Sequence, residues 1–310
     1  MKRWERPQCE VVRPLISVGI PVYNGERFLR RAIDALLGEG LGSDLEIIIS
    51  DNASSDGTQQ ICESYASKHD TVHYSREPLN RGAAFNYNRV LAMSRGRYFK
   101  WNAHDDFIRP GYFKEVLAEL QDHVDAVGVF TNAVYVDDAG HEISDIASTA
   151  PGLTKWRGAR VEQAGKLLDL LFDDGQVAMA FAMGLYRADK LREIPQLGNY
   201  YGADWVIALE LVLAGEVRYL SEQLVAFTRH KHSSSFRAIP DAREQQRFFD
   251  PSVKSDIRIK FQHRRRFFEI FRSAARADGT LRERALLQLA IIRCCARRAR
   301  WRVRYALGAC

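Results

Sequence analysis

Six side chains of this sequence have the types and positions needed for metal-assisted chemistry. They are four acids and two histidines: Asp51, Asp105, Asp106, Asp204, His230 and His232. Asp105 and Asp106 are adjacent in GRYFKWNAHDDFIRPGYF, and two like charges that close resist joint burial. A divalent cation such as Mg²⁺ or Mn²⁺ would relieve the repulsion, because it takes one or two carboxylates together with phosphate oxygens and water.

Each of these residues also has a simpler interpretation when it is taken alone. The Asp105–Asp106 pair fits a solvated surface turn, and Asp51 begins DNASSDG, which is rich in turn formers. Asp204 lies at the start of a helical pattern, where any acid gains from the helix dipole. A single histidine is more often a surface residue than a ligand. Only the positions of all six together can decide between the two interpretations.

Strand and helix patterns alternate through the first half of the chain. The strands are expected at residues 15–24, 45–51, 72–78 and 98–103, with helices at 25–40, 59–69, 82–96 and, opened by Pro110, 111–121. This alternation predicts the α/β class, with a doubly wound, mostly parallel sheet flanked by helices. Ligands bind such sheets at the carboxyl ends of the strands, where Tyr23–Asn24, Asp51–Asn52 and Asp105–Asp106 fall.

The second half of the chain is more mixed. We expect a strand with a turn at 126–140, a mobile loop at 143–160, a buried apolar segment at 177–187 and a helix at 202–216. Residues 217–236 suggest a strand, a turn, a second strand and a polar stretch. From about Pro240 the pattern is helical to the end, which predicts a C-terminal α-helical extension.

Composition places the chain among globular proteins with an uneven charge. It has 310 residues, 46% of them apolar, with no apolar run long enough to span a bilayer and no secretory signal pattern. Five cysteines without a CxxC pair favour the cytoplasm. Residues 254–310 carry sixteen Lys and Arg against four Asp and Glu, a balance of +12, whereas residues 1–253 have a balance of −6.

The sequence lacks the signature motifs of several classes of nucleotide-binding protein. GxGxxG and GxxxxGK[ST] do not occur, which argues against dinucleotide-binding dehydrogenases and P-loop NTPases. A nucleotidyltransferase should carry a Gly-rich basic loop, and PVYNGERF is not one. The acidic body and the lack of a recognised motif argue against a nucleic-acid partner.

Three segments in order resemble the family 2 glycosyltransferases of GT-A fold. They are ISVGIPVYNGERFLRRAIDALL, LEIIISDNASSDGTQQI and LNRGAAFNYNRVLAMSRGRYFKWNAHDD, and a looser likeness continues through GADW and FTRHKHSSS. The resemblance implies an inverting enzyme that uses a nucleotide-sugar donor, with UDP or TDP favoured, and Mg²⁺ or Mn²⁺ as cofactor. The acceptor hydroxyl would belong to a polysaccharide, glycolipid or other glycoconjugate.

The same resemblance implies a role for individual residues. Pro21, Tyr23 and Glu26 would border the base, Asp51 would contact it, and Arg81 would lie near the nucleotide. HisAspAsp matches the DxD-like motif, so Asp105 would contact the ribose and Asp106 the metal, with His104 in place of the first acid. His230, favoured over His232, would reach the metal or the diphosphate. In GADW the acid usual at the position of Ala203 is missing, and Asp204 would be the general base.

The resemblance divides the chain into a catalytic domain at 1–238 and a basic helical extension at 239–310. Arg interleaved with apolar residues in the extension suits an anionic membrane surface, which would make the protein peripheral on the inner face of the membrane. Packing on the catalytic domain or formation of a homodimer fits the same pattern. The alternative function is a non-catalytic or degenerate nucleotide-sugar-binding protein recruited through this tail.

Overall fold

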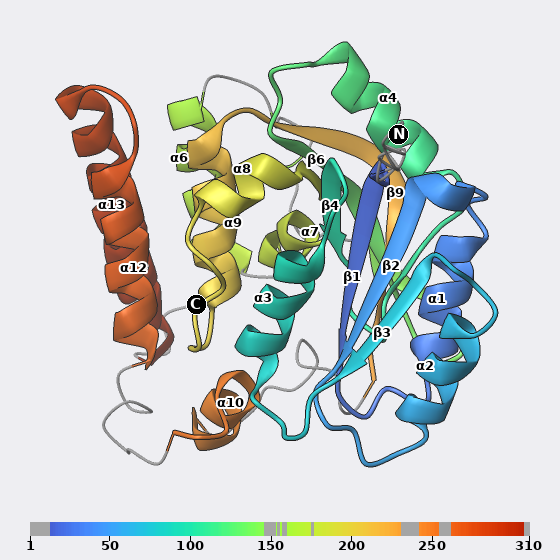
Figure 1. Ribbon diagram of the computed structural model, residues 1–310. Coiled ribbons are helices and arrows are strands. Elements are labelled where there is room, and N and C mark those ends of the chain that lie inside the picture. The colour runs from blue at the N-terminus through green and yellow to red at the C-terminus, as the bar shows by residue number, and fades with distance from the viewer. Residues whose placement is uncertain are drawn as a thin grey trace, which may run out of the picture.

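A large β-sheet lies at the centre of the computed structural model, which describes residues 13–145, 153, 156, 160–174, 177–230, 242–253 and 262–306 (Figure 1). Within these residues the sheet has nine strands: β1 (Ile16–Val22), β2 (Leu45–Asp51), β3 (Val72–Arg76), β4 (Tyr98–Trp101), β5 (Phe107–Ile108), β6 (Gly128–Val136), β7 (Glu142–Asp145), β8 (Leu185–Arg187) and β9 (Val217–Thr228). Their order is β3-β2-β1-β4-β8-β6-β9-β5, and β7 pairs with β6.

Most of the paired residues in the sheet belong to parallel strands. Parallel pairings join β3 to β2, β2 to β1, β1 to β4 and β6 to β9. Antiparallel pairings join β4 to β8, β8 to β6, β9 to β5 and β6 to β7. Every residue of β1, β2 and β6 is buried, as expected for strands covered on both faces. The predicted α/β class and mostly parallel sheet are confirmed.

Helices cover both faces of the sheet. They are α1 (Leu29–Leu37), α2 (Thr58–Ala66), α3 (Ala83–Met93), α4 (Tyr112–Asp122), α6 (Arg160–Asp174), α7 (Val177–Ala182), α8 (Ala188–Glu193), α9 (Ala203–Ala214), α10 (Ala242–Phe249), α12 (Gln262–Arg276) and α13 (Leu281–Ala306), with a 3₁₀ turn at Gly42–Asp44. Figure 1 shows α1 and α2 on one side of β1–β3 and α3 on the other. This is the doubly wound arrangement that the alternating pattern predicts.

The strand register brings three predicted polar segments to one edge of the sheet. Val22, the last residue of β1, lies beside Asp51, the last residue of β2. β4 runs parallel on the other side of β1, with Gly19 beside Trp101. The residues that follow these three strands therefore leave the sheet at the same edge, as the sequence predicts.

Some local predictions were wrong in detail. Residues 217–228 form one continuous strand, β9, in place of a strand, a turn and a second strand; its pairing with β6 shifts register near Asn132, which accommodates the polar middle. Helix α4 begins at Tyr112 after Gly111, so Pro110 precedes the helix and is not in its first turn. The expected loop at 143–160 opens with the end of β7, and its remaining residues lie largely outside the described ones.

The predicted C-terminal helical extension is confirmed, and its helices pack on the rest of the chain. Helix α12 contacts α9, and α13 contacts both α6 and α12 (Figure 1). The buried side chains at these contacts include Ile270, Leu287, Ile291 and Cys294. The predicted domain boundary between residues 238 and 239 lies outside the described residues.

Candidate functional site

The adjacent acids Asp105 and Asp106 lie in the turn between β4 and β5, and the end of β9 holds them there. The Asp106 side chain is almost fully buried, and its Oδ1 accepts the backbone N–H of Thr228 at 2.9 Å. The Thr228 hydroxyl donates to the backbone carbonyl of Asp105 at 2.5 Å. It also accepts a hydrogen bond from Arg31 Nη2, on α1, at 2.7 Å. Two elements distant in sequence, α1 and β9, therefore fix this turn.

Two histidines flank Asp105, and this decides which acid carries the charge. His230 Nε2 lies 3.0 Å from Asp105 Oδ2, and His104 Nδ1 lies 4.0 Å from Asp105 Oδ1. Burial favours the neutral acid, but His104 and His230 outweigh it and hold the pKa of Asp105 below its ordinary value. For Asp106, burial and then the charge of Asp105 raise the pKa well above the ordinary value. The pair thus favours one negative charge until a cation is added.

The chemistry of this pair fits a hard divalent cation that also contacts a ligand. Among the described residues, no group of three or more His, Cys, Asp or Glu side chains is arranged to hold a metal ion. Mg²⁺ is commonly bound by one or two carboxylates together with substrate phosphates, and an all-protein cage is not needed. Asp106, buried beside a second acid, is a carboxylate whose charged form a cation would stabilise.

The structure places His230 against Asp105, a position that sequence reasoning did not specify. Its ring packs 4.6 Å from the ring of Phe28, at the start of α1, and little of it is exposed. A bond to the carboxylate fixes the orientation of the imidazole, as outer partners do in metal sites. His232 lies outside the described residues, so its predicted role stays a prediction.

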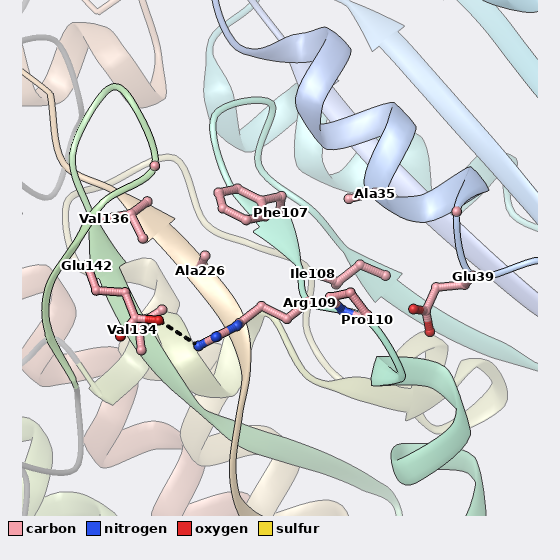
Figure 2. Close-up of a pocket in the computed structure, with 12 residues that line it drawn as sticks. Ala35, Glu39, Phe107, Ile108, Arg109, Pro110, Val134, Val136, Glu142 and Ala226 are labelled. Carbon is pink, nitrogen blue, oxygen red and sulfur yellow. Dashed lines mark ion pairs between the residues drawn. The ribbon is translucent and has the colours of Figure 1, made fainter.

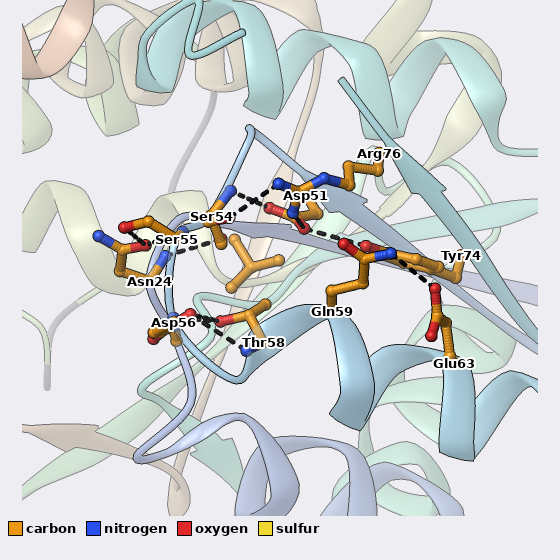
Figure 3. A network of polar contacts seen from close by, with 12 residues as sticks. Asn24, Asp51, Ser54, Ser55, Asp56, Thr58, Gln59, Glu63, Tyr74 and Arg76 are labelled. Atoms are coloured by element: carbon orange, nitrogen blue, oxygen red, sulfur yellow. Dashed lines mark hydrogen bonds and ion pairs between the residues drawn. The ribbon is translucent and has the colours of Figure 1, made fainter. Parts of the chain in front are cut away.

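Asp51 ends β2 at the same sheet edge, with its carboxylate turned toward β3 (Figure 3). Oδ2 accepts from Arg76 Nη1 at 2.6 Å and from the Tyr74 hydroxyl at 3.0 Å, and Oδ1 accepts the Ser54 N–H at 2.8 Å. A carboxylate has about four acceptor sites, so these bonds leave capacity for roughly one more donor. The Asp51 side chain is 0% exposed and that of Arg76 is one-third exposed, so a base that arrives from solvent would meet the Arg76 guanidinium first.

The predicted base-contacting residues of the loop after β1 differ in exposure. Pro21 is buried inside β1, opposite Ser50 of β2. Tyr23 is 45% exposed and is the aromatic side chain that this loop offers to a ligand. Glu26 instead joins two loops, since its carboxylate accepts the Gly57 N–H at 2.9 Å.

The loops after β1 and β2 are joined by a larger polar network (Figure 3). The N–H of Gly25 donates to Thr58 Oγ1 at 2.8 Å, and Asn24 Oδ1 accepts the Ser55 N–H at 2.8 Å. Asn24 has φ +53°, a conformation that Asn tolerates better than most residues. The network holds both loops in place before any ligand arrives, so it pre-organises this part of the sheet edge.

Arg81 lies in the loop before α3, and Asn52 positions that loop. Asn52 Oδ1 accepts the Arg81 N–H at 2.9 Å, and its amide donates to the backbone carbonyl of Gly82 at 3.1 Å. The Arg81 guanidinium is half-exposed and lies 3.5 Å from the centre of the Phe85 ring. The guanidinium also pairs with Glu77 at 3.8 Å, so the structure presents a half-exposed ion pair next to the end of β2.

Asp204 lies in the first turn of α9, which begins after Gly202. Burial raises the pKa of Asp204, and the charge of Arg266 on α12 opposes that rise. Burial, and then the charges of Asp105, Asp106 and Asp204, raise the pKa of Tyr87, on α3. The three carboxylates therefore lie near enough to Tyr87 for their charges to act on it.

The C-terminal helices contribute residues beside Asp204 that sequence reasoning missed. Arg266 lies 4.0 Å from the centre of the Trp205 ring, and its side chain occupies the space where a Cβ on Gly202 would project. Gly202 has φ +81°, so glycine is suited there both by conformation and by this close contact. The available signals were the run RRR at 264–266 and the glycine before the predicted base.

Helix α10 contacts both sides of the site. Gln246 donates to the backbone carbonyl of Asn199 at 2.7 Å, and the Asn199 amide donates to Asp250 at 2.8 Å. On the other side, the carbonyl of Phe249 lies against Gly82. Figure 1 shows α10 beneath the first residues of α3. The C-terminal segment therefore touches both the loop that carries Arg81 and the loop that precedes Asp204.

A separate cavity opens between α1 and the β6–β7 hairpin (Figure 2). Its walls include Phe107, Ile108 and Val136, and Arg109 pairs with Glu142 across it at 3.1 Å. None of the predicted site residues lines it. The cavity therefore has no place in the chemistry of the sheet edge.

Comparison with known proteins agrees with this arrangement. The family model of glycosyl transferase family 2 matches residues 17–191, which include Asp51, Asp105 and Asp106. An uncharacterized glycosyltransferase of Rickettsia typhi is 33% identical over 132 residues. That alignment covers 42% of this chain but only 40% of the relative.

Two solved structures show a similar fold. TarS of S. aureus, residues 1–349 in complex with UDP-GlcNAc, has a TM-score of 0.63 and 16% identity, covering 89% of this chain and 71% of that 1–349 chain. A mannosyltransferase of Pyrobaculum calidifontis in complex with GDP-Man and Mn²⁺ has a TM-score of 0.51 and 16% identity, covering 93% of this chain and 88% of that chain. At such identity the likeness concerns the fold, which is the GT-A fold.

Proposed function

Because the chain belongs to glycosyl transferase family 2, we propose that it transfers a sugar from a nucleoside-diphosphate sugar to an acceptor hydroxyl. UDP or TDP is the favoured leaving group, and the acceptor belongs to a polysaccharide, glycolipid or other glycoconjugate. The observation that carries this proposal is the Asp105–Asp106 turn, which Thr228 and His230 contact at the sheet edge where β2 ends in Asp51. The charges of Asp105, Asp106 and Asp204 all act on Tyr87, which supports a place for Asp204 near this turn. These are the acids that a donor site and a general base require.

The leaving diphosphate would be held at the Asp105–Asp106 turn. Bound Mg²⁺ or Mn²⁺, held by Asp106 with His230 close by, would act there as a Lewis acid. The structural neighbour with GDP-Man contains Mn²⁺, which supports a metal of this kind. Asp105, kept ionised by His104 and His230, would contact the ribose. The half-exposed Arg81 would add positive charge beside the diphosphate.

The base of the donor would bind between the loops after β1 and β2. Tyr23 supplies an exposed aromatic ring. The Asp51 side chain is 0% exposed, so its part would be to hold Arg76 in place against the base. Arg76, bonded to Asp51, presents donors to the carbonyl oxygens of a pyrimidine. The tethers from Glu26 and Thr58 keep both loops in place, so little ordering is needed on binding.

Asp204 would remove the proton from the acceptor hydroxyl as the hydroxyl attacks the anomeric carbon. Its raised pKa makes it a better proton acceptor than an ordinary aspartate. Direct attack with a single base on the side opposite the leaving group inverts the anomeric configuration. Arg266 would limit the rise in the pKa of Asp204 and so favour the ionised carboxylate that a base requires.

Thermal shift with UDP, TDP, GDP and CDP, with and without Mn²⁺, tests the donor site. We expect stabilisation by one diphosphate that depends on Mn²⁺, since a ligand at 100 times its Kd stabilises by about 2.7 kcal/mol. Asp106→Ala should abolish the metal-dependent part. Asp44→Asn, an exposed acid at the opposite end of β2, is the matched control. No stabilisation by any nucleotide would contradict the proposed function.

Turnover tests the role of Asp204 separately. Asp204→Asn should bind the nucleotide as the wild type does and lose roughly 10²–10⁴-fold in kcat, the usual contribution of a general base. The anomeric configuration of the product, read by NMR, should be opposite to that of the donor. Full activity in Asp204→Asn, or retention of configuration, would show that the proposed base or the direct displacement is wrong.

A further inference from the structure

Helix α13 is apolar on two faces, and only one of them packs on the part of the chain that the structure describes. Its inner face buries Leu287 and Ile291 at the contacts with α6 and α12. Its outer face carries Leu286, Leu289 and Ile292, which are 50%, 61% and 51% exposed. A helix that only needed to pack on the catalytic domain would place polar residues at these positions.

Arginines border the exposed apolar side chains along the same helix. Arg282 and Arg293 are eleven residues apart, which is three helical turns, so they lie in line beside Leu286 and Leu289. Arg297 continues the line and pairs with Asp169 of α6 at 3.1 Å. The sequence contains no Asp or Glu after Glu283. The exposed face is therefore both apolar and positively charged.

We propose that the outer face of α13, defined as Arg282, Leu286, Leu289, Ile292 and Arg293, docks on an anionic lipid bilayer. Leu and Ile side chains would enter the boundary between head groups and acyl chains, while the arginines would pair with acidic head groups. Among the described residues, no helix is both long and apolar enough to cross a membrane. The helix would therefore lie along the surface.

Charge favours a bilayer over a second copy of the chain as the occupant of this face. A two-fold dimer would bring the same surface of each copy together. The line formed by Arg282 and Arg293 would then approach its own equivalent, and the one acid in the sequence of α13, Glu283, is already bonded to Thr280 at the start of the helix, so it offsets little of the repulsion. An anionic bilayer supplies the opposite charge and an apolar layer at once.

Packed helices link the docking helix α13 to the segment that carries Asp204. Helix α12 contacts α13 on one side and α9 on the other, and its Arg266 lies beside Trp205, the neighbour of Asp204. Three helices thus connect the outer face of α13 with the start of α9. Vesicle binding is measured without turnover, so its outcome is independent of the test of glycosyl transfer.

Flotation of the full-length protein with vesicles tests the docking surface. Vesicles of neutral phosphatidylcholine are compared with vesicles that contain 30% phosphatidylglycerol as the probe, at about 0.05 and 0.5 M NaCl. We expect the protein to float with the anionic vesicles at low salt and to be released at high salt. Arg282→Gln/Arg293→Gln should weaken binding about 25-fold, since each arginine near such a surface contributes about 5-fold.

Two further variants separate apolar insertion from charge and from self-association. Leu289→Gln/Ile292→Gln keeps every arginine and should still lose at least about 10-fold in binding. Val124→Gln, at an apolar residue that is 70% exposed and follows α4, should bind as the wild type. Circular dichroism and light scattering establish that each variant is folded and in which oligomeric state.

Three results would overturn the proposal. The first is failure to float with anionic vesicles at low salt. The second is equal binding by both double variants and the wild type. The third is a dimer in light scattering that Leu289→Gln/Ile292→Gln dissociates, which would assign the outer face of α13 to a second copy.

Discussion

The hydroxyl of Thr228 should control metal affinity although it is not a predicted ligand. The side chain is 2% exposed and connects Arg31 with the Asp105 carbonyl. Thr228→Val keeps the shape of the side chain and the backbone N–H that bonds Asp106, and it removes only the hydroxyl. The Asp105 carbonyl then loses its donor, and a buried polar group left in this state costs about 1–3 kcal/mol.

Thr228→Val should also make the Asp105–Asp106 turn less well ordered, and this turn positions both carboxylates. Loss of an outer partner of a metal ligand typically weakens metal binding 10–100-fold. We therefore expect the Mn²⁺ concentration needed for half-maximal nucleotide binding to rise by that factor in Thr228→Val, as measured by titration calorimetry at saturating nucleotide. Urea unfolding of the metal-free protein measures the loss of stability independently.

Thr131→Val is the matched control for this prediction. Thr131 is also a buried β-strand threonine, 3% exposed, and its hydroxyl donates to the carbonyl of Asn132 at 2.9 Å. The control should lose stability to a similar degree and keep its metal affinity. If Thr228→Val lost stability like the control but bound Mn²⁺ as tightly as the wild type, the role assigned to the Arg31–Thr228 contact would be refuted.

Three further predictions concern charge and backbone conformation. Arg266→Gln removes the cation that lowers the pKa of Asp204. The pH below which kcat/KM falls should therefore be higher in this variant than in the wild type. An unchanged pH dependence of kcat/KM would show that Arg266 does not act on the base. Burial lowers the pKa of Lys100 to about 7. The Lys100 ammonium group therefore loses its proton more readily in the folded state than in the unfolded chain. The free energy of unfolding should accordingly rise between about pH 7 and pH 10. One unit of pKa difference corresponds to about 1.36 kcal/mol, so the full difference between the folded and unfolded pKa of Lys100 corresponds to roughly 5 kcal/mol of unfolding free energy. Lys100→Met should abolish this rise of unfolding free energy with pH, as measured by urea melts at pH 7 and 9. Gly82→Ala should destabilise by at least about 1–2 kcal/mol, because Gly82 has φ +86° and the added Cβ would meet the carbonyl that ends α10. Gly165→Ala, in open space on α6, should instead be slightly stabilising in the same urea melts.

The sheet edge was predictable from sequence because it depends on short-range patterns. Each of β1, β2 and β4 is an apolar run followed by polar residues, and parallel strands bring their carboxyl ends together whatever the details of packing. The long strand β9 was not predictable in the same way. Its middle, RYLSEQ, looks like a turn, and only pairing with the buried β6 keeps it extended.

The contacts that support the acid pair could not be predicted from sequence, because they join segments that are far apart along the chain. Arg31 and Thr228 are 197 residues apart. Both lie inside segments that carry the resemblance, ISVGIPVYNGERFLRRAIDALL and FTRHKHSSS, but the resemblance implied no role for either residue. The segment FTRHKHSSS drew attention to its histidines, whereas the threonine before them makes two contacts that fix the acid pair. Such roles depend on which helix lies over which strand end, and periodicity in one segment contains no information about that.

The position of the acid pair explains why metal and nucleotide should bind together. The described residues around Asp105 and Asp106 do not complete a metal cage, and burial raises the pKa of Asp106 well above its ordinary value. A cation binding alone would have to displace that proton and would still lack ligands, so its affinity should be low. In the proposed donor complex, diphosphate oxygens would supply the missing ligands, and the same cation would offset the repulsion between phosphate and Asp105. Each partner should then strengthen the binding of the other by an equal factor, because binding free energies are coupled reciprocally. The proposal therefore predicts that the two adjacent carboxylates bind a metal–diphosphate complex much more tightly than they bind the metal alone.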